Sequence, residues 1–94
     1  MSSLATAHEA RALEVRCTDD ELIVRLTDGR KLSAPLAWFP RLSRATAQQR
    51  NSFELLGEGE GIHWPEVDED ISIAGLLAGI PSVEARRDKT ARSA

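Results

Sequence analysis

Alternation of apolar and polar residues over residues 13–34 constrains the fold of this chain more than any other feature. Apolar side chains stand at every second position in three stretches, which are separated at Asp19-Asp20 and at Asp28-Gly29. A period of two is typical of a strand that buries one face. We therefore expect a three-strand antiparallel meander whose core-facing residues are Leu13, Val15, Cys17, Leu22, Val24, Leu26, Leu32 and Ala34.

The second hairpin of this meander has a register that can be argued from the same pattern. A two-residue loop at Asp28-Gly29 would pair Val24 with Ser33 and would mix apolar and charged side chains on one face, as any one-residue slip does. A three-residue loop over 27–29, with Gly29 in the left-handed conformation, avoids this mixing. It places four apolar residues on the core face, in the pairs Val24 with Leu32 and Leu22 with Ala34.

Two short helices are predicted in the second half of the chain. Thr46 and Gln49 have the spacing of a capping box, which predicts a helix from about 47 to 53. A second helix is predicted after Ser72, its N-cap, and before Gly79 and Pro81, which stop helices. Its apolar face follows helical spacing and consists of Ile73, Leu76, Leu77 and Ile80.

One or two short strands are also expected there. Residues 62–64 read as a strand that Pro65 ends, and a weaker strand is expected around residues 53–56. Between them stand Gly57, Gly59 and Gly61, which we interpret as a hairpin turn or hinge. The expected fold class is thus α+β, with a small antiparallel sheet and two short helices.

The length of 94 residues, 41% of them hydrophobic, is enough for one small core. We expect a flexible N-terminus at 1–10, one domain at 11–81 and a flexible tail at 82–94. No apolar run approaches the roughly 18 to 20 residues that cross a bilayer, and no export leader is recognisable. Cys17 is the sole cysteine and cannot form an internal disulfide, so we expect a cytoplasmic protein.

Charge is unevenly distributed along the chain. Residues 25–53 hold six basic side chains and one acidic one, whereas residues 54–70 hold seven acidic side chains and no lysine or arginine. Two interpretations are open: separate surfaces for two partners, or self-complementary charge that meets within the fold or across a homodimer. We favour the second. Direct binding of nucleic acid by this chain alone is not expected, because the net charge is -3 and phosphate contacts need a basic face.

Catalytic motifs are scarce in the sequence. Cys17 falls on the predicted buried face, where a thiol packs rather than reacts, and no nucleophile motif surrounds the serines. We therefore expect a protein that is not an enzyme and has no cofactor. The alternative is a metal- or small-ligand-binding enzyme, whose ligands would be the carboxylates and imidazole of His63, Glu66, Asp68 and Asp70.

Two blocks of residues carry a resemblance to a known family. They are W-F-P-R-L at 38–42 and G-I-H-W-P-x-x-D-E-D-I-S at 61–72. With the residues between Leu22 and Gly79, they closely resemble the small bacterial domain-of-unknown-function family 2442. The resemblance implies a compact α+β domain without established catalytic residues. Some members are joined to a helix-turn-helix domain, and stand-alone members tend to be encoded beside another small protein, a layout similar to toxin-antitoxin pairs.

The hypothesis that follows is a non-catalytic protein-interaction module, antitoxin-like or a regulatory partner of a small protein encoded nearby. The large aromatic residues either fill the core or form an exposed patch of the kind found at interfaces. We predict an interaction surface for a small, basic partner, made of Trp38, Phe39, Pro40, Arg41, Arg44, His63, Trp64, Glu66, Asp68 and Asp70. A structural homo-oligomer is a further alternative.

Overall fold

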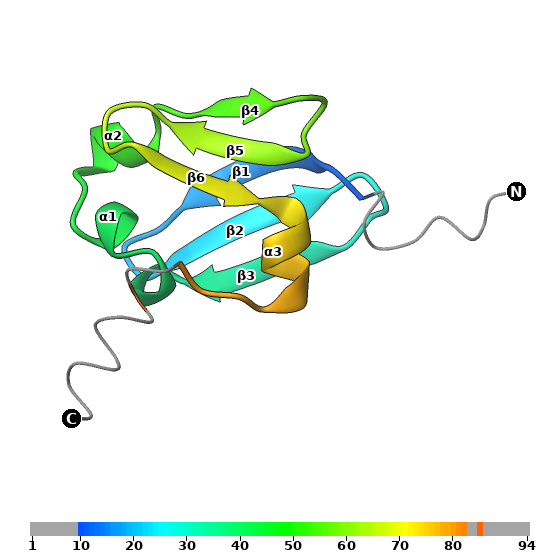
Figure 1. The fold of residues 1–94 in the computed structure, drawn as a ribbon, viewed down its shortest axis with the longest axis horizontal. Coiled ribbons are helices and arrows are strands. Elements are labelled where there is room, and N and C mark those ends of the chain that lie inside the picture. The colour runs from blue at the N-terminus through cyan, green and yellow to red at the C-terminus, as the bar shows by residue number, and fades with distance from the viewer. Residues whose placement is uncertain (1–9, 83–84, 86–94) are drawn as a thin grey trace, which may run out of the picture.

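The first half of the chain folds as the predicted meander. The computed structural model, which describes residues 10–82 and 85, pairs β1 (Ala12–Cys17), β2 (Glu21–Leu26) and β3 (Lys31–Pro35) in the order β1-β2-β3. Both pairings are antiparallel. This sheet is the lower layer of the molecule in Figure 1.

The predicted register of the second hairpin is confirmed. Val24 lies opposite Leu32, and Leu22 lies opposite Ala34. The Leu26 amide donates to the Arg30 carbonyl over 2.8 Å, which closes a three-residue loop. Gly29 in that loop has φ 95°, in the left-handed region that glycine enters without steric cost.

The first strand departs from the prediction at Leu13. The pairing of β1 with β2 shifts between Ala12 and Glu14, so Leu13 is the extra residue of a β-bulge. Ala12 is buried in the core, and Leu13 is 53% exposed. Beyond the bulge, Val15 and Cys17 face the core as predicted. The prediction that Leu13 is buried was wrong because simple alternation does not anticipate an inserted residue.

Three short helical segments connect the two halves, where one helix was predicted. The 3₁₀-helix η3 (Leu36–Trp38) and α1 (Pro40–Ser43) come first, and α2 (Ala47–Arg50) follows. Proline occupies the first position of α1, where its missing N–H costs nothing. Helix α2 is shorter than predicted, but both hydrogen bonds of its capping box, between Thr46 and Gln49, are present.

The second half adds a sheet of its own. It consists of β4 (Glu54–Leu56), β5 (Gly61–Trp64) and β6 (Glu69–Ser72), antiparallel and in that order, followed by α3 (Ile73–Ala78). Strand β6 was not predicted. Its Ile71 is buried and pairs with Ile62.

Helix α3 has the predicted N-cap and ends as predicted. The Ser72 hydroxyl accepts a 2.9 Å hydrogen bond from the Gly75 amide, and Gly79 ends the helix with φ 74°. Ile80 lies beyond this end and is exposed, so it does not share the buried face with Ile73 and Leu76 as predicted.

The two sheets pack around one hydrophobic core, with α3 against β3 (Figure 1). The Ala12 amide donates to the Gly59 carbonyl over 2.8 Å and so ties the first sheet to the β4–β5 turn, whereas the Ile73 amide donates to the Glu60 carbonyl over 2.9 Å and extends the β5–β6 pairing. Within the described part of the chain, no helix is long and apolar enough to cross a membrane. The predicted flexible ends lie almost wholly outside the described residues.

Candidate functional site

The aromatic residues of the predicted interaction surface belong mostly to the core. Phe39 is 3% exposed, Trp64 is fully buried, and Pro40 is buried as well. Trp38 is half-buried and meets Phe39 edge-on, with 6.5 Å between the ring centres. These side chains hold the fold together, so a partner can reach only the other members of the predicted set.

Arg50 is the residue that holds the buried Trp64 and the short helices together. The Trp64 indole Nε1 donates to the Arg50 carbonyl over 2.9 Å. The Arg50 guanidinium donates to the carbonyl oxygens of Leu42, at 2.9 Å, and Ser43, at 3.0 Å, at the C-terminal end of α1. Its side chain is 11% exposed, so this arginine supports the fold and is not available to a ligand.

Four polar members of the predicted surface form two pairs, Arg41 with Asp68 and His63 with Asp70. Arg41 Nη1 lies 2.7 Å from the Asp68 carbonyl oxygen and 3.6 Å from its carboxylate. On the outer face of the second sheet, His63 Nδ1 lies 2.5 Å from Asp70 Oδ1. The two sequence blocks therefore meet, and the Arg41 to Asp68 pair joins the basic and acidic segments within the fold.

The metal-binding alternative is not supported by this arrangement. Among residues 10–82 and 85, no three His, Cys, Asp or Glu side chains are grouped so that they could hold a metal ion. Asp68 turns to Arg41, and Asp70 turns to His63. The four side chains lie close in sequence, but the β5–β6 hairpin does not bring them to one point.

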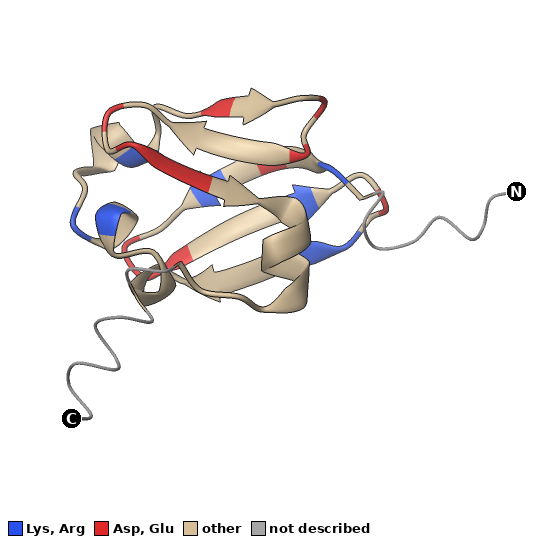
Figure 2. Ribbon diagram, in the orientation of Figure 1, with Lys and Arg blue, Asp and Glu red and all other residues tan. Residues whose placement is uncertain are grey.

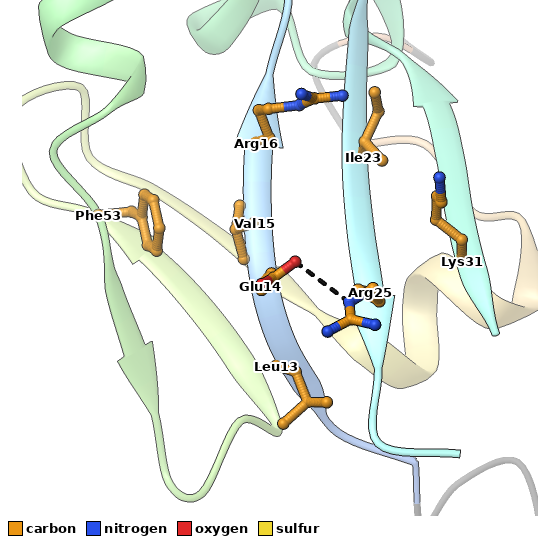
Figure 3. A pocket seen from close by; sticks show the side chains of 8 residues that line it. All are labelled: Leu13, Glu14, Val15, Arg16, Ile23, Arg25, Lys31 and Phe53. Atoms are coloured by element: carbon orange, nitrogen blue, oxygen red, sulfur yellow. Dashed lines mark hydrogen bonds and ion pairs between the residues drawn. The ribbon is translucent and has the colours of Figure 1, made fainter. Parts of the chain in front are cut away.

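A groove on the outer face of the first sheet was not predicted. It has a volume of about 570 Å³ and runs across β1, β2 and β3 to Phe53, just before β4 (Figure 3). Because side chains alternate across a strand, most of its lining residues point away from the core, whereas Val15 and Phe53 border it at the edge of β1 and also pack against the core. The lining residues are Leu13, Glu14, Val15, Arg16, Ile23, Arg25, Lys31 and Phe53.

Positive charge prevails in this groove. Glu14 accepts a 3.1 Å hydrogen bond from Arg25 Nε, which neutralises one cation. Arg16 and Lys31 remain, on opposite outer strands of the sheet (Figure 3). Figure 2 shows the contrast with β6, where acidic residues follow one another. The alternating pattern predicts that these residues face outward, but it does not indicate that they border a groove.

Cys17 lies on the core side of β1, away from this groove. Burial raises the pKa of its thiol, and the nearby Arg50 opposes that rise. The thiol is therefore protonated at neutral pH, which is the unreactive form.

Comparisons with known proteins place the chain in a family. A solved structure of a protein of unknown function from Rhodospirillum rubrum is 35% identical, with a TM-score of 0.70, over 82% of this chain and 95% of that one. A solution structure of an uncharacterized protein from Chromobacterium violaceum has 24% identity and a TM-score of 0.63, over 77% of this chain and 68% of that one, and shows the shared fold. The search of curated proteins found no match. The model of the family described as "Protein of unknown function (DUF2442)" matches residues 12–82, and this chain belongs to that family.

Proposed function

We propose that this protein is a non-catalytic protein-interaction module, an antitoxin-like or regulatory partner of a small protein encoded beside it. The observation that supports this function best is the groove on the outer face of the first sheet. It combines apolar side chains with cations, a mixture that protein interfaces use and that needs no reacting group.

The titratable groups that a catalyst would use are kept apart. Cys17 is on the core side of the first sheet, whereas His63 is on the outer face of the second sheet and pairs with Asp70. A cysteine nucleophile needs a base within hydrogen-bond reach and a lowered pKa, and burial raises the pKa of this thiol. The arrangement therefore favours binding over catalysis.

The ion pairs of the acidic segment also indicate where a partner would bind. We expected a basic partner on the acidic segment, but such a partner would have to compete with Arg41 for Asp68 and with His63 for Asp70. In the groove, Arg16 and Lys31 form no such pairs with carboxylates of the described residues. We therefore place the partner-binding surface of the module on the first sheet.

Co-expression with the product of the adjacent open reading frame tests the proposed function. We expect the two proteins to co-purify, to elute as one species by size-exclusion chromatography with light scattering, and to bind with micromolar or tighter affinity by calorimetry. Absence of a complex at micromolar concentration, together with no effect of co-expression on growth, would refute it. A salt-sensitive dimer of this chain alone would instead support the homo-oligomer alternative.

A further inference from the structure

We infer that the groove on the first sheet holds an acidic segment of the partner protein, with an apolar side chain next to its carboxylates. This inference rests on the proposed interaction function and adds the chemistry of the bound segment. It is carried by the cations in the groove, by the bulge that shapes it and by its apolar lining.

The cations of the groove differ from the others in the described part of the chain. Six arginines make hydrogen bonds or ion pairs within the protein: Arg11, Arg25, Arg30, Arg41, Arg44 and Arg50. The remaining cations among residues 10–82 are Arg16 and Lys31, and both line the groove. Two exposed cations without an internal carboxylate, on one concave surface, favour a ligand that brings its own carboxylates.

The bulge in β1 supplies an apolar contact for the same ligand. Without the extra residue, Leu13 would face the core, and instead it lies 53% exposed at one end of the groove. Bulges often re-aim a side chain beside a functional site. Ile23 at the centre of the sheet and Phe53 across from Val15 continue the apolar lining (Figure 3).

A protein segment fits these features better than a nucleic acid does. Nucleic-acid affinity comes mainly from many phosphate contacts, whereas this groove offers only two cations without an internal carboxylate, Arg16 and Lys31. A phosphate backbone would leave Leu13 and Ile23 without apolar partners. An acidic segment with an apolar residue satisfies both parts of the lining.

Titration with labelled synthetic peptides tests the inference directly. The probe is a short peptide that alternates glutamate and leucine, followed by fluorescence anisotropy. We expect saturable binding that weakens about tenfold when glutamine replaces glutamate, and about tenfold when serine replaces leucine. Equal binding of all three peptides, or stronger binding of a single-stranded oligonucleotide of the same charge, would overturn the inference.

Charge-reversal variants locate the binding site and separate the two proposals. Arg16→Glu and Lys31→Glu should each weaken binding of the acidic peptide several-fold, and the double variant about tenfold or more. Arg30→Glu, the control, makes the same change of charge at an exposed position that does not line the groove and should bind normally. Thermal unfolding verifies that all four variants are folded. If the product of the adjacent reading frame binds and neither Arg16→Glu nor Lys31→Glu weakens that complex, the interaction function stands and the groove assignment fails.

Discussion

The backbone of Gly59 lies so close to Ala12 that a Cβ atom on Gly59 would stand 2.6 Å from the Ala12 carbonyl oxygen. Real Cβ atoms essentially never approach backbone oxygen so closely. The contact belongs to the same crossing in which the Ala12 amide donates to the Gly59 carbonyl. It joins the β4–β5 turn to the start of β1, immediately before the bulge at Leu13.

Gly59→Ala should therefore be strongly destabilising. The substitution adds a clash with the Ala12 backbone to the strain of a side chain at φ 95°. We expect a loss of about 3 kcal/mol or more in the free energy of unfolding by urea denaturation. Gly29→Ala is the matched control, because Gly29 has the same φ but nothing within 4 Å of its added Cβ, so a loss of about 1 kcal/mol is expected. Equal losses would show that the close approach to Ala12 does not matter.

Trp64→Phe should cost more stability than Trp38→Phe. The first change leaves the Arg50 carbonyl without its hydrogen bond and opens space around a fully buried ring. We expect a loss of about 3 kcal/mol, from the unsatisfied carbonyl and the lost packing together. Trp38→Phe should reduce the free energy of unfolding by less than half as much, because Trp38 is half-buried. Urea denaturation followed by circular dichroism gives both values, and a reversed order would contradict the assigned role of Trp64.

Asp28 should make the stability of the protein depend on acid pH. The Arg30 guanidinium, which donates to Asp28 Oδ2 over 2.8 Å, holds the pKa of this carboxyl below its ordinary value of 3.8. The stabilisation is present above pH 3.8 and is lost as the pH falls through the lowered pKa. Asp28→Asn should therefore reduce Tm slightly at neutral pH and leave it unchanged in strong acid, because the pair is at the surface. A reduction in Tm that is the same at both pH values would refute the ion pair as its cause.

Cys17 should be protected from thiol reagents and should affect stability at alkaline pH. Burial raises the pKa of its thiol above the ordinary value of 9.0, so the associated stability is present below pH 9.0 and is lost as the pH rises through the raised pKa. We expect Ellman's reagent to react far more slowly with the folded protein than with the urea-unfolded protein. Cys17→Ser should also show a smaller loss of stability above pH 9.0. Identical alkaline profiles for the two proteins would contradict this prediction.

The elements that could be predicted are those whose signals lie within a few residues. The meander and its register follow from alternation together with the turn at Asp28-Gly29, because a slip of one residue would expose a whole apolar face. The capping box at Thr46 and the N-cap at Ser72 are likewise local, since each satisfies amides one turn away. Strand β6 was not predicted because Ile71 is its only apolar residue and stands between the polar residues Asp70 and Ser72.

The candidate site could not be predicted in the same way. Alternation predicts that Arg16, Ile23 and Arg25 point away from the core, so this part of the groove lining could be predicted from the sequence. The hollow itself depends on Phe53, which comes from a segment far along the chain, and on Leu13, which the bulge turns outward. The same holds for Arg50, whose partners lie in α1 and β5.

The sequence by itself determined which strands form in the first half, how they pair and where the helices are capped, because hydrogen bonding and burial within a hairpin or a helical turn depend on near neighbours. Only the tertiary structure decided that Trp64 and Phe39 are core residues and that the free cations Arg16 and Lys31 border a groove. Those outcomes depend on how the second sheet packs on the first, and that packing is set by contacts between residues that are distant along the chain.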